Sequence, residues 1–394
     1  MKNDRRKNDQ RKNDRRKNDR MNRPGNWAEW ATRELAGVRA AGRFRAPRDF
    51  DAAGPEGKLA PDGRPVVSFA SNDYLGLTQH PAVVAAARAA LDRWGAGAGS
   101  ARLIVGSRPV HSELEAALAE WKAMPGAALF PTGFATNLGV LTALAGPGVL
   151  VCSDELNHAS IIDGCRLARA DVAVYRHRDI DHVAALLADA GGHRTIVVTD
   201  SVFSMDGDIA PLDDLVALCR GAGALLVVDE AHAVLGPEPA GEGIEMLRIG
   251  TLSKTLGALG GFVAGPRPLV DLVVNRARSY IFTTAPTPAD AAASLASLRV
   301  LRSPEGDHLI TRLRDHVERL RPGHPSPILA VLCGDEASAL DASAALLERG
   351  LLVPAIRPPT VPVGTSRLRI ALSAAHTDEQ IGMLAGALDD LGLS

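Results

Sequence analysis

The chain has 394 residues, of which 46% are hydrophobic, 4% are aromatic and 23% are charged, and its formal net charge is −2 at pH 7. This composition excludes a generally basic nucleic-acid-binding protein and leaves few rings for base stacking or for an aromatic belt at a membrane. No apolar stretch reaches the roughly 20 residues that span a bilayer, so we expect a cytoplasmic protein with no membrane segment and no nucleic-acid partner.

Residues 1–20 differ from the rest of the chain. They hold ten Lys and Arg against four Asp, a net charge of +6, in a five-residue repeat with no apolar side chain after Met1. Such a segment cannot bury a core, and we expect it to be disordered. A basic tail that binds nucleic acid or an anionic surface is one interpretation. The favoured one is a leader or start-site artefact, because ordinary-looking sequence begins at Met21. The segment lacks the apolar stretch of a signal peptide and holds too many Asp for a transit peptide.

The next elements predict an arm that leads into a larger domain. We expect residues 21–64 to form an N-terminal helical arm, with a helix from Trp27 to about Arg45. A strand over 65–69 and a polar turn at 71–74 follow. Further along, the pattern predicts helices over 82–94 and 113–121, with a flexible Gly-rich loop at 95–100 between them.

After residue 121 strand and helix patterns alternate, as in α/β proteins. Apolar runs occur at 127–130, 149–152, 172–175, 195–199, 225–228, 247–251 and 261–264. Their continuous apolar character predicts a mostly parallel seven-stranded sheet covered on both faces, in a large domain over 65–270. Residues 271–394 are expected to form a smaller α+β domain, with strands at 328–332 and 368–372.

The four cysteines, Cys152, Cys165, Cys219 and Cys333, show neither C-x-x-C spacing nor a zinc-finger pattern. They predict reduced, mostly buried thiols, and no metal site is expected.

Two motifs indicate a pyridoxal phosphate (PLP) enzyme. The apolar residues Val227 and Val228 are followed by Asp229 and then by His232. A second apolar run, at 247–251, is followed by Lys254 in a Gly-rich context. PLP needs a lysine for its Schiff base and a carboxylate that keeps its ring nitrogen protonated. The turn Thr132-Gly133-Phe134, which follows a strand and opens a helix, suits the phosphate group. Because these motifs follow strands of one parallel sheet, we expect them to meet in one crevice.

Four further stretches resemble the α-oxoamine synthases, which are PLP-dependent enzymes of fold type I. They are residues 71–77, 157–160, 201–208 and 367–370, and the resemblance runs from about Trp27 to Ser394. It implies a homodimer whose active sites lie between the subunits.

The resemblance also implies roles for individual residues. Lys254 would be the Schiff-base lysine and the base that removes and returns the Cα proton, and Asp229 would bind the ring nitrogen. His232, assisted by Ser204, would hydrogen-bond the phenolic oxygen of the ring. His158 would stack on the ring face opposite the substrate. Thr251, with Thr283 and Thr284 from the partner subunit, would complete the phosphate site.

For the substrates, the resemblance implies that Arg369 pairs with the amino-acid carboxylate and that Asn72 lies near the same site. Arg43 of the N-terminal arm matches a substrate-binding position, and Arg45 is an alternative. His111 and Ser112 fall beside the glycine loop, where relatives approach the acyl thioester.

Within the family, residues 101–111 and 355–362 favour the branch of biotin biosynthesis. The expected reaction joins L-alanine to a pimeloyl thioester, and both pimeloyl-CoA and pimeloyl-acyl-carrier protein stay open as donors. The alternative enzyme is a glycine C-acetyltransferase or another α-oxoamine synthase. The alternative outside enzymes is an inactive PLP-fold protein that binds nucleic acid through residues 1–20.

Overall fold

The computed structural model describes residues 26–241 and 243–393, so the predictions for residues 1–20 lie outside it. Its largest sheet has seven strands in the order β4-β10-β9-β8-β7-β5-β6. They are β4 (Gly126–Phe130), β5 (Val149–Asp154), β6 (Asp171–Tyr175), β7 (Arg194–Asp200), β8 (Leu225–Asp229), β9 (Met246–Thr251) and β10 (Gly261–Gly265). Only β10 runs against its neighbours; the other strands of this sheet share one direction. The predicted mostly parallel sheet is confirmed.

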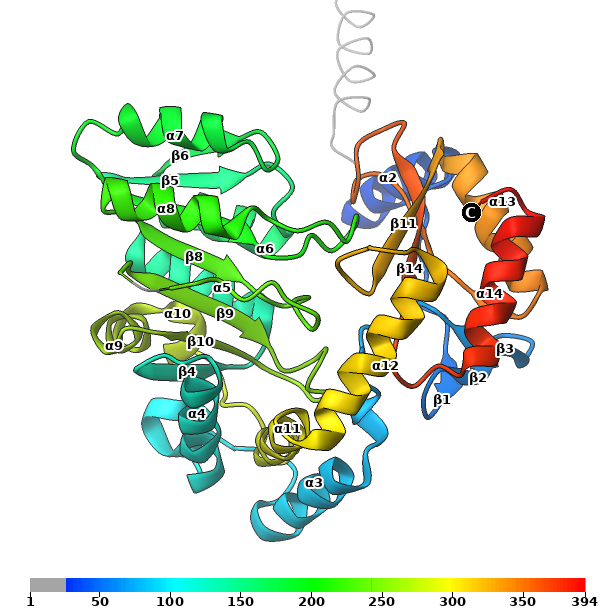
Figure 1. Cartoon of the computed structure of the whole chain (residues 1–394), viewed down its shortest axis with the longest axis horizontal. Coiled ribbons are helices and arrows are strands. Elements are labelled where there is room, and N and C mark those ends of the chain that lie inside the picture. The colour runs from blue at the N-terminus through cyan, green and yellow to red at the C-terminus, as the bar shows by residue number, and fades with distance from the viewer. Residues whose placement is uncertain (1–25, 242, 394) are drawn as a thin grey trace, which may run out of the picture.

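Helices cover both faces of this sheet, which explains why its strands are apolar without alternation (Figure 1). The covering helices are α5 (Gly133–Leu144), α6 (Ala159–Ala168), α7 (Ile180–Ala188), α8 (Leu212–Ala222) and α9 (Arg267–Arg276). Val227 of β8 packs in a core cluster with residues of α5, α6 and α9. Its neighbours Leu226 and Val228 pack in a second cluster with residues of α7 and α8. Successive residues of one strand therefore enter opposite cores.

A second region contains two smaller sheets and lies on the other side of the view in Figure 1. One sheet has the order β11-β14-β13 and the other has the order β1-β2-β3-β12. The strands are β1 (Phe50–Ala52), β2 (Glu56–Leu59), β3 (Arg64–Ser68), β11 (Ile328–Gly334), β12 (Leu351–Leu352), β13 (Ala355–Ile356) and β14 (Ser366–Ala371). The remaining long helices are α2 (Trp27–Ala40), α3 (Pro81–Trp94), α4 (Pro109–Trp121), α11 (Pro288–Leu301), α12 (Pro304–Leu320), α13 (Glu336–Glu348) and α14 (Asp378–Asp390).

The N-terminal arm is helical over a shorter stretch than its pattern predicts. Helix α2 ends at Ala40, and Gly42 follows with a φ of 66°, a left-handed conformation that stops a helix. Strands β1 and β2 then lie within the predicted arm. β3 pairs in parallel with β12, so residues 64–68 join a sheet with the C-terminal region. The division into domains at 65 and 270 stays a prediction.

Gly207 lies where the large domain meets β11, and its replacement is the first test of the fold. Its φ is 75°, and a Cβ at this position would lie 1.9 Å from the carbonyl oxygen of Ile328. We expect Gly207→Ala to lower the free energy of unfolding by about 3 kcal/mol, as measured by urea denaturation. Gly323 has the same φ of 75° but nothing within 4 Å of its Cβ position. Gly323→Ala should therefore cost only about 1 kcal/mol, and equal losses in the two variants would contradict the steric argument.

Candidate active site

Several of the residues predicted to bind the cofactor lie at the edge of the large sheet where its parallel strands end. β8 ends at Asp229, β9 ends at Thr251, and β4 ends two residues before Thr132. In open α/β sheets this edge is where ligands bind. A cavity of about 1240 Å³ opens in this region, and the predicted site residues that line it are Asn72, His158, Ser204, His232, Lys254 and Arg369.

Lys254 and His232 are in direct contact in this cavity. Nζ of Lys254 lies 2.8 Å from Nε2 of His232, and Nδ1 of His232 lies 2.6 Å from the hydroxyl of Tyr74. Burial lowers the pKa of Lys254, and the positive charge of Arg369 lowers it further. Burial also lowers the pKa of His232 well below its usual value, and Lys254 adds to this effect. A lysine with a lowered pKa supplies the free amine that a Schiff base requires.

Asp229 is a buried carboxylate with two hydrogen-bond donors. Its side chain accepts a bond of 2.6 Å from Nδ2 of Asn137 and one of 2.9 Å from the N–H of Ala231. Nδ2 of Asn137 also donates to Oγ of Ser160, which lies 2.7 Å from Nδ1 of His158. Asp229 is 6% exposed. A chain of hydrogen bonds therefore joins the predicted partner of the ring nitrogen to the predicted stacking histidine.

The start of helix α5 forms a site for an anion. Thr132 is the N-cap, and its Oγ1 accepts a 3.0 Å bond from the N–H of Ala135. The N–H groups of Gly133 and Phe134 are the first of the helix and have no carbonyl of that helix to bind. A Cβ on Gly133 would lie 3.2 Å from Cβ of Thr251, so glycine allows the helix end to approach β9 closely. N–H groups and helix dipole together suit a phosphate.

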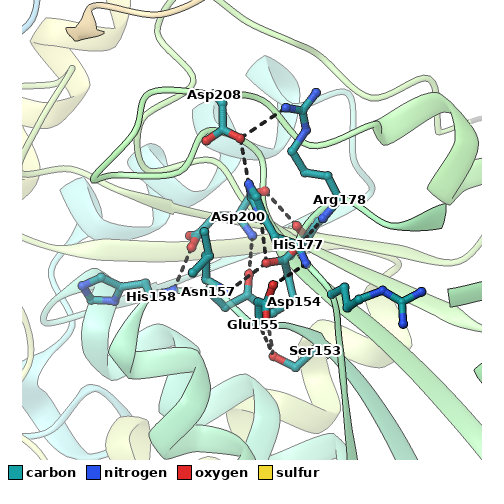
Figure 2. Close-up of polar contacts among 12 residues, drawn as sticks. Ser153, Asp154, Glu155, Asn157, His158, His177, Arg178, Asp200 and Asp208 are labelled. Atoms are coloured by element: carbon teal, nitrogen blue, oxygen red, sulfur yellow. Dashed lines mark hydrogen bonds and ion pairs between the residues drawn. The ribbon is translucent and has the colours of Figure 1, made fainter. Parts of the chain in front are cut away.

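His158 is held at the rim of the cavity by a buried acid. Its backbone N–H donates a 2.7 Å bond to Oδ2 of Asp200, and the N–H of Asp200 donates a 2.9 Å bond to Oδ1 of Asn157 (Figure 2). Asp200 ends β7 and pairs in register with Asp229 of β8. Burial and then the charge of Asp229 raise the pKa of Asp200 well above its usual value. The ring of Phe134 lies 6.3 Å from the His158 ring in an edge arrangement.

Arg369 joins the small domain to this site. Its Nε donates a 2.5 Å bond to the carbonyl of Ser204, and one terminal nitrogen donates a 3.1 Å bond to Oδ1 of Asn72. The side chain comes from β14 and is buried. A guanidinium positioned in this way can receive the carboxylate of an amino acid through its planar fork.

Nine of the predicted residues do not line this cavity: Thr132, Gly133, Phe134, Asp229 and Thr251, which lie at strand ends and at the start of α5, and Arg43, Arg45, Thr283 and Thr284. Arg43 pairs with Glu336 at 2.5 Å, and Arg45 donates to a backbone carbonyl at 3.2 Å. Neither arginine is among the residues that line the cavity, and Thr283 and Thr284 do not line it either. The two threonines are predicted to act in the site of a partner subunit. The roles of these residues, like those of the residues that line the cavity, stay predictions.

Of the two residues noted beside the glycine loop, His111 is fully buried. Its Nε2 lies 2.9 Å from the carbonyl of Pro286, and its Nδ1 accepts a 2.8 Å bond from the N–H of Arg108. Both ring nitrogens are therefore used within the chain, while Ser112 is exposed.

Sequence reasoning did not identify Asn137, Asp200 and Tyr74 as site residues. Tyr74 belongs to the predicted turn at 71–74, and Asp200 directly follows the apolar run at 195–199, so each lies in or beside a recognised element. Asn137 has no such signal, because it is one polar residue in an apolar helix. Its position one turn after Gly133 places it against Asp229, and this contact between residues 92 positions apart requires the tertiary structure.

The residues present fit PLP. A buried carboxylate, a lysine with a lowered pKa and a helix N-terminus lie around one crevice, and Oδ1 of Asn137 is buried with no hydrogen-bond partner among the described residues. Within residues 26–241 and 243–393, no group of three or more His, Cys, Asp or Glu side chains is arranged to hold a metal ion. No helix in that same part of the chain is long and apolar enough to cross a membrane.

Comparisons with known proteins agree with this geometry. An 8-amino-7-oxononanoate synthase from Alkalilimnicola ehrlichii is 46% identical over 374 residues, which cover 90% of this chain and 95% of the relative. The synthase of that name from Anaeromyxobacter dehalogenans is 48% identical over 389 residues, covering 92% of this chain and 96% of the relative.

Solved structures of PLP enzymes share the fold. A serine palmitoyltransferase variant from S. paucimobilis, with a bound PLP–myriocin aldimine, has a TM-score of 0.85 and 31% identity, covering 94% of this chain and 100% of that one. An 8-amino-7-oxononanoate synthase from Francisella tularensis has a TM-score of 0.68 and 25% identity, covering 83% and 98%. The predicted α/β architecture of PLP fold type I is confirmed. A family model described as aminotransferase class I and II matches residues 64–388. The chain therefore belongs to the aminotransferase class I and II family and, within it, to the 8-amino-7-oxononanoate synthases.

Proposed function

We propose that the protein is a PLP-dependent acyltransferase that condenses L-alanine with a pimeloyl thioester, giving 8-amino-7-oxononanoate, CO2 and the free thiol. The observation that carries the proposal is the contact of 2.8 Å between Lys254 and His232, in the cavity beside the buried Asp229. Relatives with 46% and 48% identity that are named 8-amino-7-oxononanoate synthase support the substrates.

PLP supplies an aldehyde for the amino group and a ring that delocalises the electron pair left at Cα. The protein's own side chains would handle the protons. Asp229 holds the proton on the ring nitrogen, because a buried carboxylate there favours the cationic ring. Lys254, with its lowered pKa, removes the Cα proton and returns it after CO2 is lost. His232 hydrogen-bonds the phenolic oxygen of the ring.

The remaining residues would orient the substrate. Arg369 would hold the carboxylate of L-alanine, and His158 would cover the ring face away from the substrate. Thr132, Gly133 and Thr251 would bind the phosphate at the start of α5. Phe134, whose ring lies edge-on to that of His158, would lie near the cofactor ring. These residues fix the Cα–H bond relative to Lys254, and such orientation is a large part of catalysis.

The carboxylate assignment gives a prediction for Arg369. Arg369→Lys keeps the charge but loses the planar fork, so we expect the KM for L-alanine to rise roughly 10- to 100-fold with kcat changed less than about threefold. Arg312→Lys is the matched control, since Arg312 donates to the carbonyl of His376 and does not line the cavity. If Arg369→Lys leaves the KM for L-alanine unchanged, Arg369 does not bind the carboxylate of this substrate.

A homodimer is part of the proposal. The helical turn η2 (Arg102–Gly106) exposes Leu103, Ile104 and Val105 by 51%, 74% and 69%, and Phe282 is 68% exposed. Contiguous exposed apolar side chains are typical of interfaces, and Thr283 and Thr284 directly follow Phe282. If a second copy of the chain covers this surface, Thr283 and Thr284 of the first copy would reach the phosphate site of the second. Sedimentation that finds an active monomer would contradict this arrangement.

The proposed donor is a pimeloyl group on CoA or on acyl-carrier protein, and the proposed location is the cytoplasm. The four cysteines are free, and Cys152, Cys165 and Cys219 are buried, as in a reducing compartment.

The test is release of the thiol by the PLP-loaded protein. We expect turnover with L-alanine and pimeloyl-CoA, and we expect deletion of residues 1–20 to leave the rate unchanged. Turnover restricted to glycine with acetyl-CoA, or to serine with palmitoyl-CoA, would assign a different member of the family. DNA binding with a steep salt dependence and no turnover would instead support the non-enzymatic alternative.

A further inference from the structure

His177 lies outside the residues assigned to cofactor and substrate, yet both of its ring nitrogens contact carboxylates. Nδ1 lies 3.0 Å from Oδ1 of Asp154 and Nε2 lies 2.7 Å from Oδ2 of Asp208, as Figure 2 shows. An ionised carboxylate only accepts hydrogen bonds, so a ring that donates to two of them carries a proton on each nitrogen. His177 is therefore an imidazolium between two acids.

The two acids hold two different turns that border the cavity: residues 155–158, which directly follow Asp154, line it, and so does Asp208 itself. Asp154 is the last residue of β5, and its side chain also accepts bonds from the N–H groups of Leu156 and Arg178, at 2.9 and 3.0 Å. It thereby holds the turn at 155–158. Asp208 closes the turn at 203–208, where its carbonyl accepts a 2.9 Å bond from the N–H of Phe203.

Each turn carries residues of the proposed active site. The turn at 155–158 ends in His158, and the turn at 203–208 contains Ser204, whose carbonyl accepts the bond from Arg369. Asp206 of the second turn pairs with Arg367 of β14. Residues of both turns and His177 itself line the cavity of about 1240 Å³. The rings of His177 and Phe203 pack at nearly a right angle, with centroids 4.4 Å apart.

We propose that His177 is a positioning residue that joins these two turns through its charge and so sets the distance between His158 and the Ser204–Arg369 contact. The inference rests on the proposed function, because it concerns where L-alanine binds.

Without the imidazolium, few groups would compensate the two acids. Arg178 lies 3.3 Å from Oδ2 of Asp208, and Oδ1 of Asp208 is buried with no hydrogen-bond partner in the described part of the chain. Other charged or titratable groups face these acids: Glu155 accepts the backbone N–H of His177, and Asp200 and Tyr175 have pKa values raised first by burial and, with smaller weight, by the charge of Asp154. Burial lowers the pKa of His324, and the charge of Asp208 opposes that shift. A neutral His177 would therefore leave the two turns held mainly by Arg178.

The same geometry sets the pH range in which the link exists. Burial opposes the charged ring, but the bonds to Asp154 and Asp208 outweigh it and raise the pKa of His177 to about 9. An ordinary histidine has a pKa of about 6.5. The charged ring therefore stabilises the folded state fully below about pH 6.5, and this stabilisation is lost as the pH rises through about 9.

The experiment compares KM, kcat and melting temperature of the PLP-loaded wild type, His177→Gln, Asp208→Asn and His193→Gln between pH 6.5 and 9.5. In the wild type, we expect the KM for L-alanine to rise above about pH 8.5. In His177→Gln, we expect a KM raised roughly tenfold at pH 7, a kcat within about threefold, and no alkaline rise in KM. His193 is exposed and contacts only a backbone carbonyl, at 3.3 Å, so His193→Gln should match the wild type.

Asp208→Asn keeps the histidine and removes one acid, so the alkaline rise in KM should move to lower pH. This variant tests the proposal even where His177→Gln does not fold. The positioning role would be overturned if both variants kept the wild-type pH dependence of KM. It would also be overturned if kcat and melting temperature both fell while the pH dependence of KM stayed the same. A wild type without turnover on L-alanine would overturn the proposed function instead, so the two failures are distinct.

Discussion

Lys254→Ala is expected to lower kcat by more than about 10⁴-fold while the protein stays folded. The substitution removes both the amine that binds PLP covalently and the base that moves the Cα proton, and general base catalysis contributes about 10²- to 10⁴-fold in enzymes. The side chain is half-buried at the cavity, so its loss should change the melting temperature little. Turnover is measured as thiol released from pimeloyl-CoA in the presence of L-alanine.

The chain offers a clear control for this experiment, because after residue 20 its lysines are Lys58, Lys122 and Lys254. Lys58 is exposed on β2, and Lys58→Ala should keep full activity. Borohydride reduction followed by peptide mapping should find PLP on Lys254 in the wild type and in the Lys58 variant. PLP fixed to Lys58 or Lys122 instead would show that the cofactor lysine has been misassigned.

Asp229→Asn is the second substitution with a large expected effect, a fall in kcat of roughly 10²- to 10³-fold. An amide has almost the same shape but no charge, so it cannot hold a proton on the ring nitrogen, and a change of one pKa unit at that nitrogen corresponds to about 1.4 kcal/mol. We expect Asp229→Asn to bind PLP, with an absorption spectrum whose pH dependence differs from that of the wild type.

Asn137→Ala provides the comparison for the acid. It removes the 2.6 Å hydrogen bond to Asp229 but keeps the charge, and a hydrogen bond to a charged group is worth about 1.5 to 3 kcal/mol. Because the charge remains, we expect a loss of kcat at the lower end of this range, roughly 10- to 20-fold, and smaller than that of Asp229→Asn. If Asn137→Ala and Asp229→Asn lose kcat equally, the position of the carboxylate matters and its charge does not.

The fold was predictable where burial has a local signature. Most strands of the large sheet appear as a continuous apolar run because helices cover both faces, and successive apolar residues of a strand such as β8 enter opposite cores. In β6, at the edge of the sheet, Val172 and Val174 stay 42% and 57% exposed. The same reasoning located Asp229, His232 and Lys254 just after two of these runs. The apolar pattern did not predict that β3 pairs with β12, because nothing in the sequence around residues 67 and 351 indicates that these residues are neighbours.

The site was predictable only in part, for the same reason. Arg43 has the residue type that its proposed role needs, but in the structure it pairs with Glu336 of α13. His177 is one of eleven histidines, and its sequence neighbours do not distinguish it. Its charge depends on Asp154 and Asp208, which are 23 and 31 positions away and meet it through two separate turns.

The class of fold and the residues proposed to carry the chemistry can thus be recognised in the amino-acid sequence. Apolar periodicity and the order acid, histidine, lysine are local properties that each segment carries by itself. The partners of those residues follow only from the tertiary structure. Tyr74 on His232, Asn137 on Asp229 and Asp200 on His158 depend on which strands become neighbours and how the turns between them close. Burial of apolar surface is non-directional and selects the segments that enter the core, whereas hydrogen bonds are directional and form only once those segments have met.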